Sequence, residues 1–145
     1  MTPPLSVLVR RRSLRQFSIG SGVAAHLAAK RKLDGLILVT PFDSLKAAAA
    51  DLFPWLPVGL FFEHEIDAGA FLATTDVPVA IIAGERDTLI RPARTEGLRK
   101  KARNLVFDRT IAGAGHNDIY ERAEFAAAMR DALVEVTTNQ AKDKR

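Results

Sequence analysis

The chain has 145 residues, a length typical of a single domain, and its 48% of hydrophobic residues is enough to fill a core. Without a cysteine it cannot form disulfides, a thiolate metal site or a cysteine nucleophile, and its three histidines make a structural zinc site a poor expectation. No apolar run reaches the roughly 18 residues that a transmembrane helix needs, and the formal net charge of +4 is unevenly distributed.

The start of the chain is strongly basic, and the residues up to position 33 include no acid. An Arg-rich, acid-poor start resembles an organelle transit peptide, suits an anionic surface, or is a solvated segment, and these interpretations stay open. Nucleic-acid binding is disfavoured, because Phe17 is the only aromatic residue in this stretch. We expect residues 1–16 to form an irregular basic N-terminus, in which Leu5–Val9 is a short candidate strand. The cations are Arg10, Arg11, Arg12, Arg15, Lys30, Arg31 and Lys32.

Three later stretches predict strands. Leu33–Thr40 is an almost continuous apolar run stopped by Pro41, and Val77–Ala83 is a second such run. Runs of this kind are typical of strands buried on both faces, as in parallel sheets. Asn104–Ile111 alternates less regularly and predicts a strand nearer an edge of the sheet.

Helix signals lie between these stretches. Ser44 or the preceding aspartate is a candidate N-cap for a short Ala-rich helix that ends near Leu52. Pro92 suits the first turn of a helix over 92–102. The other expected helices cover residues 23–32 and 122–136.

This alternation predicts an α/β fold with a parallel sheet of about 3–4 strands flanked by helices. We expect residues 17–136 to form one domain, with a lid-like segment at about 43–76. Six of the ten aromatic residues lie between positions 42 and 71, where they either line an acyl-chain pocket or form the core under a lid. Residues 137–145 are expected to be a polar tail. No internal repeat or second domain is visible.

Ser18, Asp87 and His116 follow one another at places where a parallel sheet binds its ligands, the carboxyl ends of the strands. A serine hydroxyl becomes a strong nucleophile when a histidine takes its proton and a carboxylate orients that imidazole. The backbone N–H of Ile19, next to the serine, is placed to face a developing oxyanion. The order therefore predicts the constellation of a serine hydrolase.

Each residue also has a structural interpretation. Ser18 is a candidate helix N-cap, and Asp87 is a candidate turn cap. His26 lies in a predicted helix and is interpreted as a packing or surface residue. His64, between two glutamates, lacks the i, i+4 spacing of a helical metal pair, so we expect no metal site.

Five segments in a fixed order resemble the serine hydrolases of the α/β-hydrolase superfamily, most of all their lysophospholipase-like and depalmitoylase-like branch. The resemblance covers roughly residues 17–135 and implies that Ser18 is the nucleophile, Asp87 the acid and His116 the base, with Ile19 in the oxyanion hole. It also implies cleavage of an ester or related acyl bond through an acyl-serine intermediate, without a cofactor or metal. The segments are FSIGSGVAAHLA, LDGLILVTPFDSL, FPWLPV, VPVAIIAGERDTLI and GAGHNDIY.

Two features depart from the family pattern. Gln16 stands where the elbow motif G-x-S-x-G has its first glycine. The family also has further strands before the elbow, and one of their loops supplies a second oxyanion donor, whereas about fifteen residues precede the elbow here. The expectation is therefore a truncated α/β-hydrolase fold, its C-terminal part only, with an open sheet edge.

Two alternatives of other classes remain. A truncated chain is compatible with a catalytically inactive hydrolase remnant, or with an interaction module that pairs through its sheet edge. Gly20–Ala25 matches G-x-G-x-x-A before a predicted helix, and Asp43 lies about twenty residues on, as in dinucleotide-binding domains. That interpretation leaves Asp87 and His116 without a role.

The expected partner is a small-molecule or lipid-like acyl ester, and the aromatic residues of the lid-like segment favour an apolar acyl group. Contact with a membrane surface stays open without specific support, and self-association through the sheet edge also stays open. The compartment is undetermined, with a cytoplasmic location favoured.

Overall fold

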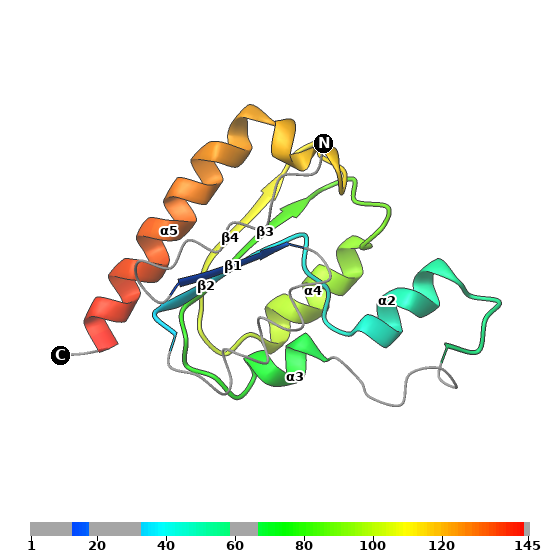
Figure 1. Cartoon of the computed structure of the whole chain (residues 1–145), viewed down its shortest axis with the longest axis horizontal. Coiled ribbons are helices and arrows are strands. Elements are labelled where there is room, and N and C mark those ends of the chain that lie inside the picture. Colours follow the sequence, from blue (N-terminus) through cyan, green and yellow to red (C-terminus); the bar gives the residue numbers. More distant parts are fainter. Residues whose placement is uncertain (1–12, 18–32, 59–66, 144–145) are drawn as a thin grey trace.

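The computed structural model describes residues 13–17, 33–58 and 67–143. They form a parallel sheet of four strands in the order β1-β2-β3-β4 (Figure 1). This confirms the expected α/β class and the size of the sheet. The strands are β1 at Ser13–Phe17, β2 at Gly35–Val39, β3 at Val79–Gly84 and β4 at Leu105–Ile111.

The helices follow the sequence signals closely. The Ser44 side chain caps α2 by accepting a hydrogen bond from the N–H of Ala47, and Pro92 begins α4 as expected. The described helices are α2 at Leu45–Leu52, α3 at Ala68–Leu72, α4 at Pro92–Lys101, the 3-10 helix η2 at Asp118–Glu121 and α5 at Ala123–Asp143.

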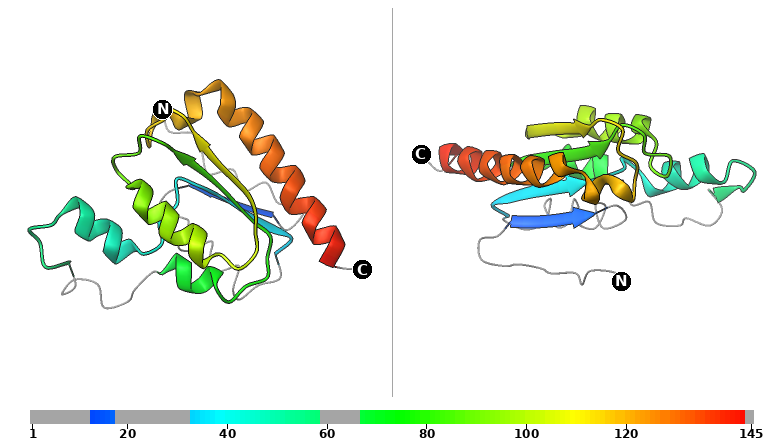
Figure 2. Two further views of the ribbon diagram at one scale, coloured as in Figure 1. Left: turned by 180° about the vertical axis from the view of Figure 1, so that it is seen from behind. Right: turned by 90° about the horizontal axis from the view of Figure 1, so that it is seen from above.

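The sheet lies between α5 on one side and α3 with α4 on the other (Figures 1 and 2). Alternate residues of a strand point to opposite faces, so each central strand serves both layers. In β2, Leu36 and Leu38 pack with α3 and α4, whereas Ile37 and Val39 pack with α5. All four side chains are fully buried, which explains why the strand is apolar throughout.

The polar strand β4 lies at an edge of the described sheet, as its sequence predicted, and its middle residues are exposed. No helix among the described residues is long and apolar enough to cross a membrane.

Two expectations about the ends of the domain need correction. The segment 1–16, expected to be irregular, includes most of β1, which pairs with β2 from Ser13 opposite Gly35 onwards. The two strands pair through backbone hydrogen bonds, and the sequence of β1 has no apolar pattern from which a strand could be predicted. The segment expected to be a polar tail after Thr137 continues α5 to Asp143.

Polar side chains in the last part of α5 hydrogen-bond to the helix itself. The Thr137 hydroxyl bonds the carbonyl oxygen of Leu133 at 2.8 Å, and the Asn139 amide donates to that of Glu135 at 2.9 Å. These side chains satisfy their polar groups on carbonyl oxygens one turn back along the helix. The strand expected at Leu5–Val9, the helix expected at 23–32 and part of the lid-like segment lie outside the described residues.

Candidate active site

Asp87 lies just beyond the carboxyl end of β3 and is buried, with 5% of its surface exposed. Its Oδ1 atom accepts hydrogen bonds from the backbone N–H groups of Leu89, at 3.0 Å, and Ile90, at 2.7 Å. A buried carboxylate needs such donors, because an unpaired charge out of water is costly. The bonds also fix the loop between β3 and α4.

The second oxygen of Asp87 meets His116, which follows β4 by a short glycine-rich turn. Asp87 Oδ2 lies 2.7 Å from His116 Nδ1, and the two side chains are 4% and 10% exposed. Because a carboxylate only accepts, Nδ1 carries the proton in this bond, and Nε2 is the nitrogen that can take a proton from another group. This is the arrangement of an acid that orients a general base.

The turn that carries His116 is held to the end of β3 by backbone contacts. The N–H of Arg86 donates to the carbonyl oxygen of Ala114 at 2.8 Å. A Cβ atom on Gly84 would lie 2.5 Å from that oxygen, so the close approach requires glycine. Gly113 has a φ of +67°, a backbone conformation that side chains disfavour.

Side chains hold the same turn from the other direction. Asp118 accepts a hydrogen bond from the N–H of Gly115 at 2.6 Å and forms an ion pair with Arg122. Arg122 in turn donates to the carbonyl oxygen of Gly113 at 2.8 Å. These donors, the Arg122 side chain first and the Gly115 N–H next, lower the pKa of Asp118 below its ordinary value.

Thr40 and Tyr120 lie beside the pair and were not anticipated from the sequence. Thr40 follows β2 with a φ of +49°, which is rare for a β-branched residue, and it is 1% exposed. Its hydroxyl bonds the carbonyl oxygen of Val39 at 2.8 Å, and its side chain also hydrogen-bonds that of Tyr120. Burial, followed by the charge of Asp87, raises the pKa of Tyr120.

No sequence pattern marks these two residues. Strained backbone conformations are common at functional sites. However, no sequence pattern predicts a positive φ at a threonine. Tyr120 comes near Asp87 only through the turn of η2.

The structure brings Asp87 and His116 together, whereas Ser18 and Ile19, like His26 and His64, lie outside the described residues. The strand β1 ends at Phe17, directly before Ser18 in the sequence. Phe17 pairs with Val39, the neighbour of Thr40. The carboxyl ends of β1 and β2 therefore lie side by side.

Within the described ranges, no group of three or more histidine, aspartate or glutamate side chains is placed to hold a metal ion. Asp43, which the dinucleotide alternative needs, has structural contacts: it accepts from the N–H of Ser44 at 2.9 Å and lies 3.5 Å from Arg94.

We compared the chain with known proteins by sequence and by structure. No model of a protein family matches the chain. The uncharacterized protein Rv2307c of Mycobacterium tuberculosis strain H37Rv is 33% identical over 101 residues, which are 70% of this chain and 36% of that protein. The chain thus spans about a third of the length of this curated relative.

Solved structures match over most of the chain. A membrane phospholipase A, described as a bacterial virulence factor, has a TM-score of 0.69 at 19% identity over 90% of this chain and 59% of its own. An α/β hydrolase, MGS-MChE2, from a metagenome of lagoon sediments has a TM-score of 0.64 at 18% identity over 86% and 62%. The esterase PF2001 of Pyrococcus furiosus has a TM-score of 0.64 at 20% identity over 85% and 52%.

These proteins share one architecture, and this chain matches between about half and two thirds of each of them. The parallel sheet and its two helical layers agree with it. The chain has the α/β-hydrolase fold, of which it covers a part.

Proposed function

We propose that the chain is a serine hydrolase that cleaves an ester or a related acyl bond through an acyl-serine intermediate. The observation that carries the proposal is the 2.7 Å hydrogen bond between the buried Asp87 and His116. The strand β1 leads into Ser18, and its carboxyl end lies on the same side of the sheet as those of the strands that precede Asp87 and His116. This supports Ser18 as the nucleophile. The matched structures include an esterase and a phospholipase A, which supports an ester as the substrate.

The first half of the proposed reaction forms the acyl-enzyme. His116 Nε2 takes the proton of the Ser18 hydroxyl while the serine oxygen attacks the carbonyl carbon of the ester. The Asp87 carboxylate stabilises the imidazolium that forms, and the N–H of Ile19 donates to the oxyanion. The imidazolium then protonates the leaving alcohol, and the acyl-serine bond remains.

The second half restores the enzyme. His116 Nε2 takes a proton from water, and the oxygen of that water attacks the acyl carbon. Collapse of the second tetrahedral intermediate returns the proton to the Ser18 oxygen and releases the carboxylic acid. No metal or organic cofactor takes part in these steps.

Labelling with a fluorophosphonate tests the proposal. The reagent phosphonylates an activated serine, and peptide mass spectrometry identifies the modified residue. We expect modification of Ser18 in the wild type, none at this position in Ser18→Ala, and a strong loss of labelling in His116→Ala. A folded wild-type protein whose Ser18 is not labelled would show instead that the chain is a non-catalytic version of the fold.

A further inference from the structure

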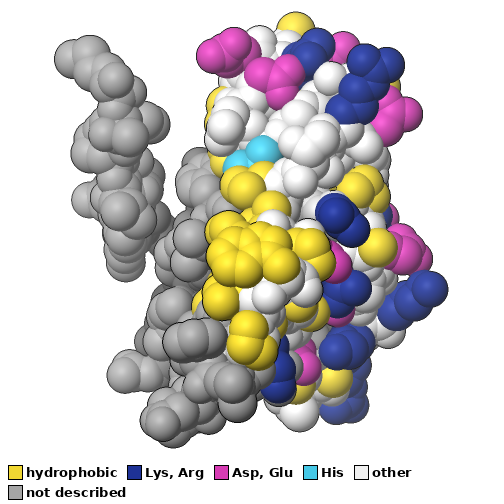
Figure 3. Space-filling view, turned by 90° about the vertical axis from the view of Figure 1, so that its right-hand side faces the viewer, with side chains coloured by type: hydrophobic (Ala, Val, Ile, Leu, Met, Phe, Trp, Pro, Cys, Tyr) yellow, Lys and Arg dark blue, Asp and Glu magenta, His cyan; other side chains and the backbone are white. Residues whose placement is uncertain are grey.

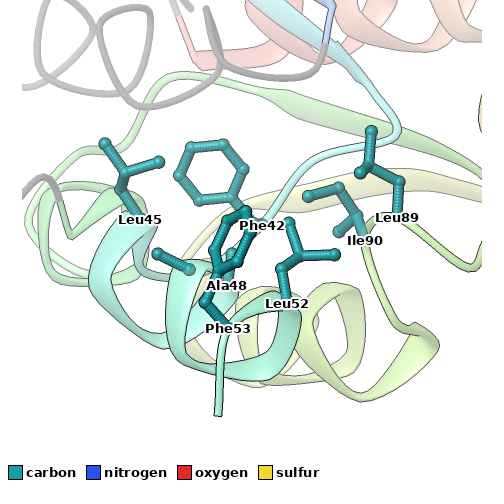
Figure 4. Close-up of a pocket in the computed structure, with 8 residues that line it drawn as sticks. Phe42, Leu45, Ala48, Leu52, Phe53, Leu89 and Ile90 are labelled. Carbon is teal, nitrogen blue, oxygen red and sulfur yellow. The ribbon is translucent and has the colours of Figure 1, made fainter. Parts of the chain in front are cut away.

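An apolar pocket of about 150 Å³ lies beside the acid–base pair, between α2 and the loops that follow β2 and β3 (Figure 4). All of its lining side chains are apolar, so it offers a ligand dispersion contacts and no hydrogen-bond partner. The lining residues are Phe42, Leu45, Ala48, Ala49, Leu52, Phe53, Leu89 and Ile90.

The pocket has a closed floor and an open mouth. Phe42, Ala48 and Ile90 form the floor, and they are only 1%, 4% and 5% exposed. At the mouth, Leu52 and Leu89 are 39% and 41% exposed. The packed floor limits how deep an apolar group can enter from the open mouth.

Asp87 connects this pocket to the chemistry. Its Oδ1 atom fixes the N–H groups of Leu89 and Ile90, which form one wall of the pocket, and its Oδ2 atom holds His116. The same carboxylate therefore sets the position of the base and of the wall. Figure 3 shows hydrophobic side chains gathered next to a histidine on this face of the molecule.

We infer that this pocket binds the acyl part of the substrate and selects a compact apolar acyl group, of about six carbons or one aromatic ring. A cavity of about this volume lined by Leu, Ile and Phe accommodates a benzene molecule. A long fatty acyl chain exceeds this volume, so most of its methylenes would lie outside the mouth of the pocket and gain no burial there. A charged or hydroxylated acyl group loses its hydration there without finding a partner. The inference rests on the proposed function, because that function identifies the bound group as an acyl group.

Ala49 and Ala50 provide a matched pair of variants on α2. Ala49 lines the pocket, whereas Ala50 is exposed and does not. Ala49→Phe fills the pocket, and Ala50→Phe adds the same ring to the same helix outside it.

The first measurement compares kcat/KM for p-nitrophenyl acetate, hexanoate, benzoate and palmitate. The wild type should prefer hexanoate or benzoate over both acetate and palmitate. In Ala49→Phe the ratio of hexanoate to acetate should fall by about tenfold or more, the effect expected for removing a few buried methylenes from a hydrophobic pocket. Ala50→Phe should keep that ratio. An unchanged ratio in Ala49→Phe, or a wild-type preference for palmitate, overturns the inference while hydrolysis itself still supports the proposed function.

The second measurement needs no catalysis. Trp55, the one tryptophan of the chain, packs edge-on against Phe53 of the pocket with ring centres 6.3 Å apart, so its fluorescence reports on the pocket. Titration with 1-hexanol should give a saturable change in the wild type and in Ala50→Phe, and about tenfold weaker binding in Ala49→Phe. Equal binding by both variants overturns the inference even if the protein hydrolyses nothing. Saturable binding without hydrolysis supports the pocket and contradicts the proposed function.

Discussion

The turn that carries His116 and the helix α2 flank the same site but are held in different ways. Polar contacts hold the turn: the ion pair of Asp118 with Arg122 and the backbone bonds to the end of β3 lie within a few residues of the histidine. The packing of α2 towards the site is apolar, through Phe42, Ala48 and Ile90.

Ion pairs join α2 and the loop before it to α4. Arg94 of α4 lies 3.0 Å from Asp51 and 3.5 Å from Asp43, and all three side chains are partly exposed. Partly exposed ion pairs contribute little, about 0–1 kcal/mol each. Directional hydrogen bonds therefore fix the position of His116, whereas the packing of apolar side chains sets the size of the pocket. Substitutions in the two regions should therefore change different kinetic quantities.

The largest expected effect is at Asp87, which bonds His116 through Oδ2 and the backbone of the pocket residues Leu89 and Ile90 through Oδ1. Asp87→Asn keeps an oxygen for the N–H groups of Leu89 and Ile90 but removes the charge that orients His116. We expect kcat/KM for an ester to fall by a factor of about 10³–10⁴. The free energy of unfolding should change little. Hydrolysis that stays within tenfold of the wild type would show that the hydrogen bond to His116 has no part in catalysis.

Asp87→Ala separates the two functions of the carboxylate. It should lose activity as Asp87→Asn does, and it also leaves two N–H groups without their acceptor. The free energy of unfolding, from urea titration, should then fall by about 2–4 kcal/mol. Equal stability of the Asn and Ala variants would contradict the structural role of Oδ1.

The next effect in size tests the contact between β3 and the His116 turn. A methyl group on Gly84 meets the backbone oxygen of Ala114, which cannot move without shifting the turn. Gly84→Ala should destabilise the protein by about 1–3 kcal/mol and lower kcat more than it raises KM. Gly113→Ala is the control, because its positive φ costs about 1 kcal/mol but a Cβ there meets no atom within 4 Å. A larger loss of activity in the control would contradict the account.

The smallest effect depends on pH. The pKa of Asp118 is lowered in the folded protein, chiefly by Arg122, so its contribution to stability is present above the ordinary value of 3.8 and is lost as the pH falls through the folded value. The difference in Tm between the wild type and Asp118→Asn should be constant near neutral pH and shrink below pH 3.8. Asp76→Asn, an exposed carboxylate paired with Arg103, is the charge-matched control. A Tm difference that stays constant into acid would show that Asp118 is not held as described.

Local signals predicted much of this fold. The continuous apolar runs at β2 and β3 followed from burial on both faces, and Ser44 and Pro92 marked helix starts by their own chemistry. Asp87 and His116 were also identified as a pair from their places after predicted strands, and the structure brings them within hydrogen-bond distance.

Contacts between distant backbone segments were beyond the sequence. The strand β1 exists through its pairing with β2, and its residues show no alternation. The strained backbone of Thr40 and its contact with Tyr120 depend on where η2 turns, which local propensity does not encode. The apolar pocket likewise combines α2 with the loop after β3, and the sequence indicated only that aromatic residues gather near α2.

In the proposed mechanism, Asp87 and His116 act together with Ser18 as one unit. Residues that act as a unit give non-additive losses when they are removed together. We therefore compare kcat/KM of Ser18→Ala, His116→Ala and the double variant on p-nitrophenyl hexanoate. We expect the double variant to be no slower than the slower single variant, within about threefold. Losses that multiply in the double variant would show that His116 acts independently of Ser18 and would contradict the proposed mechanism.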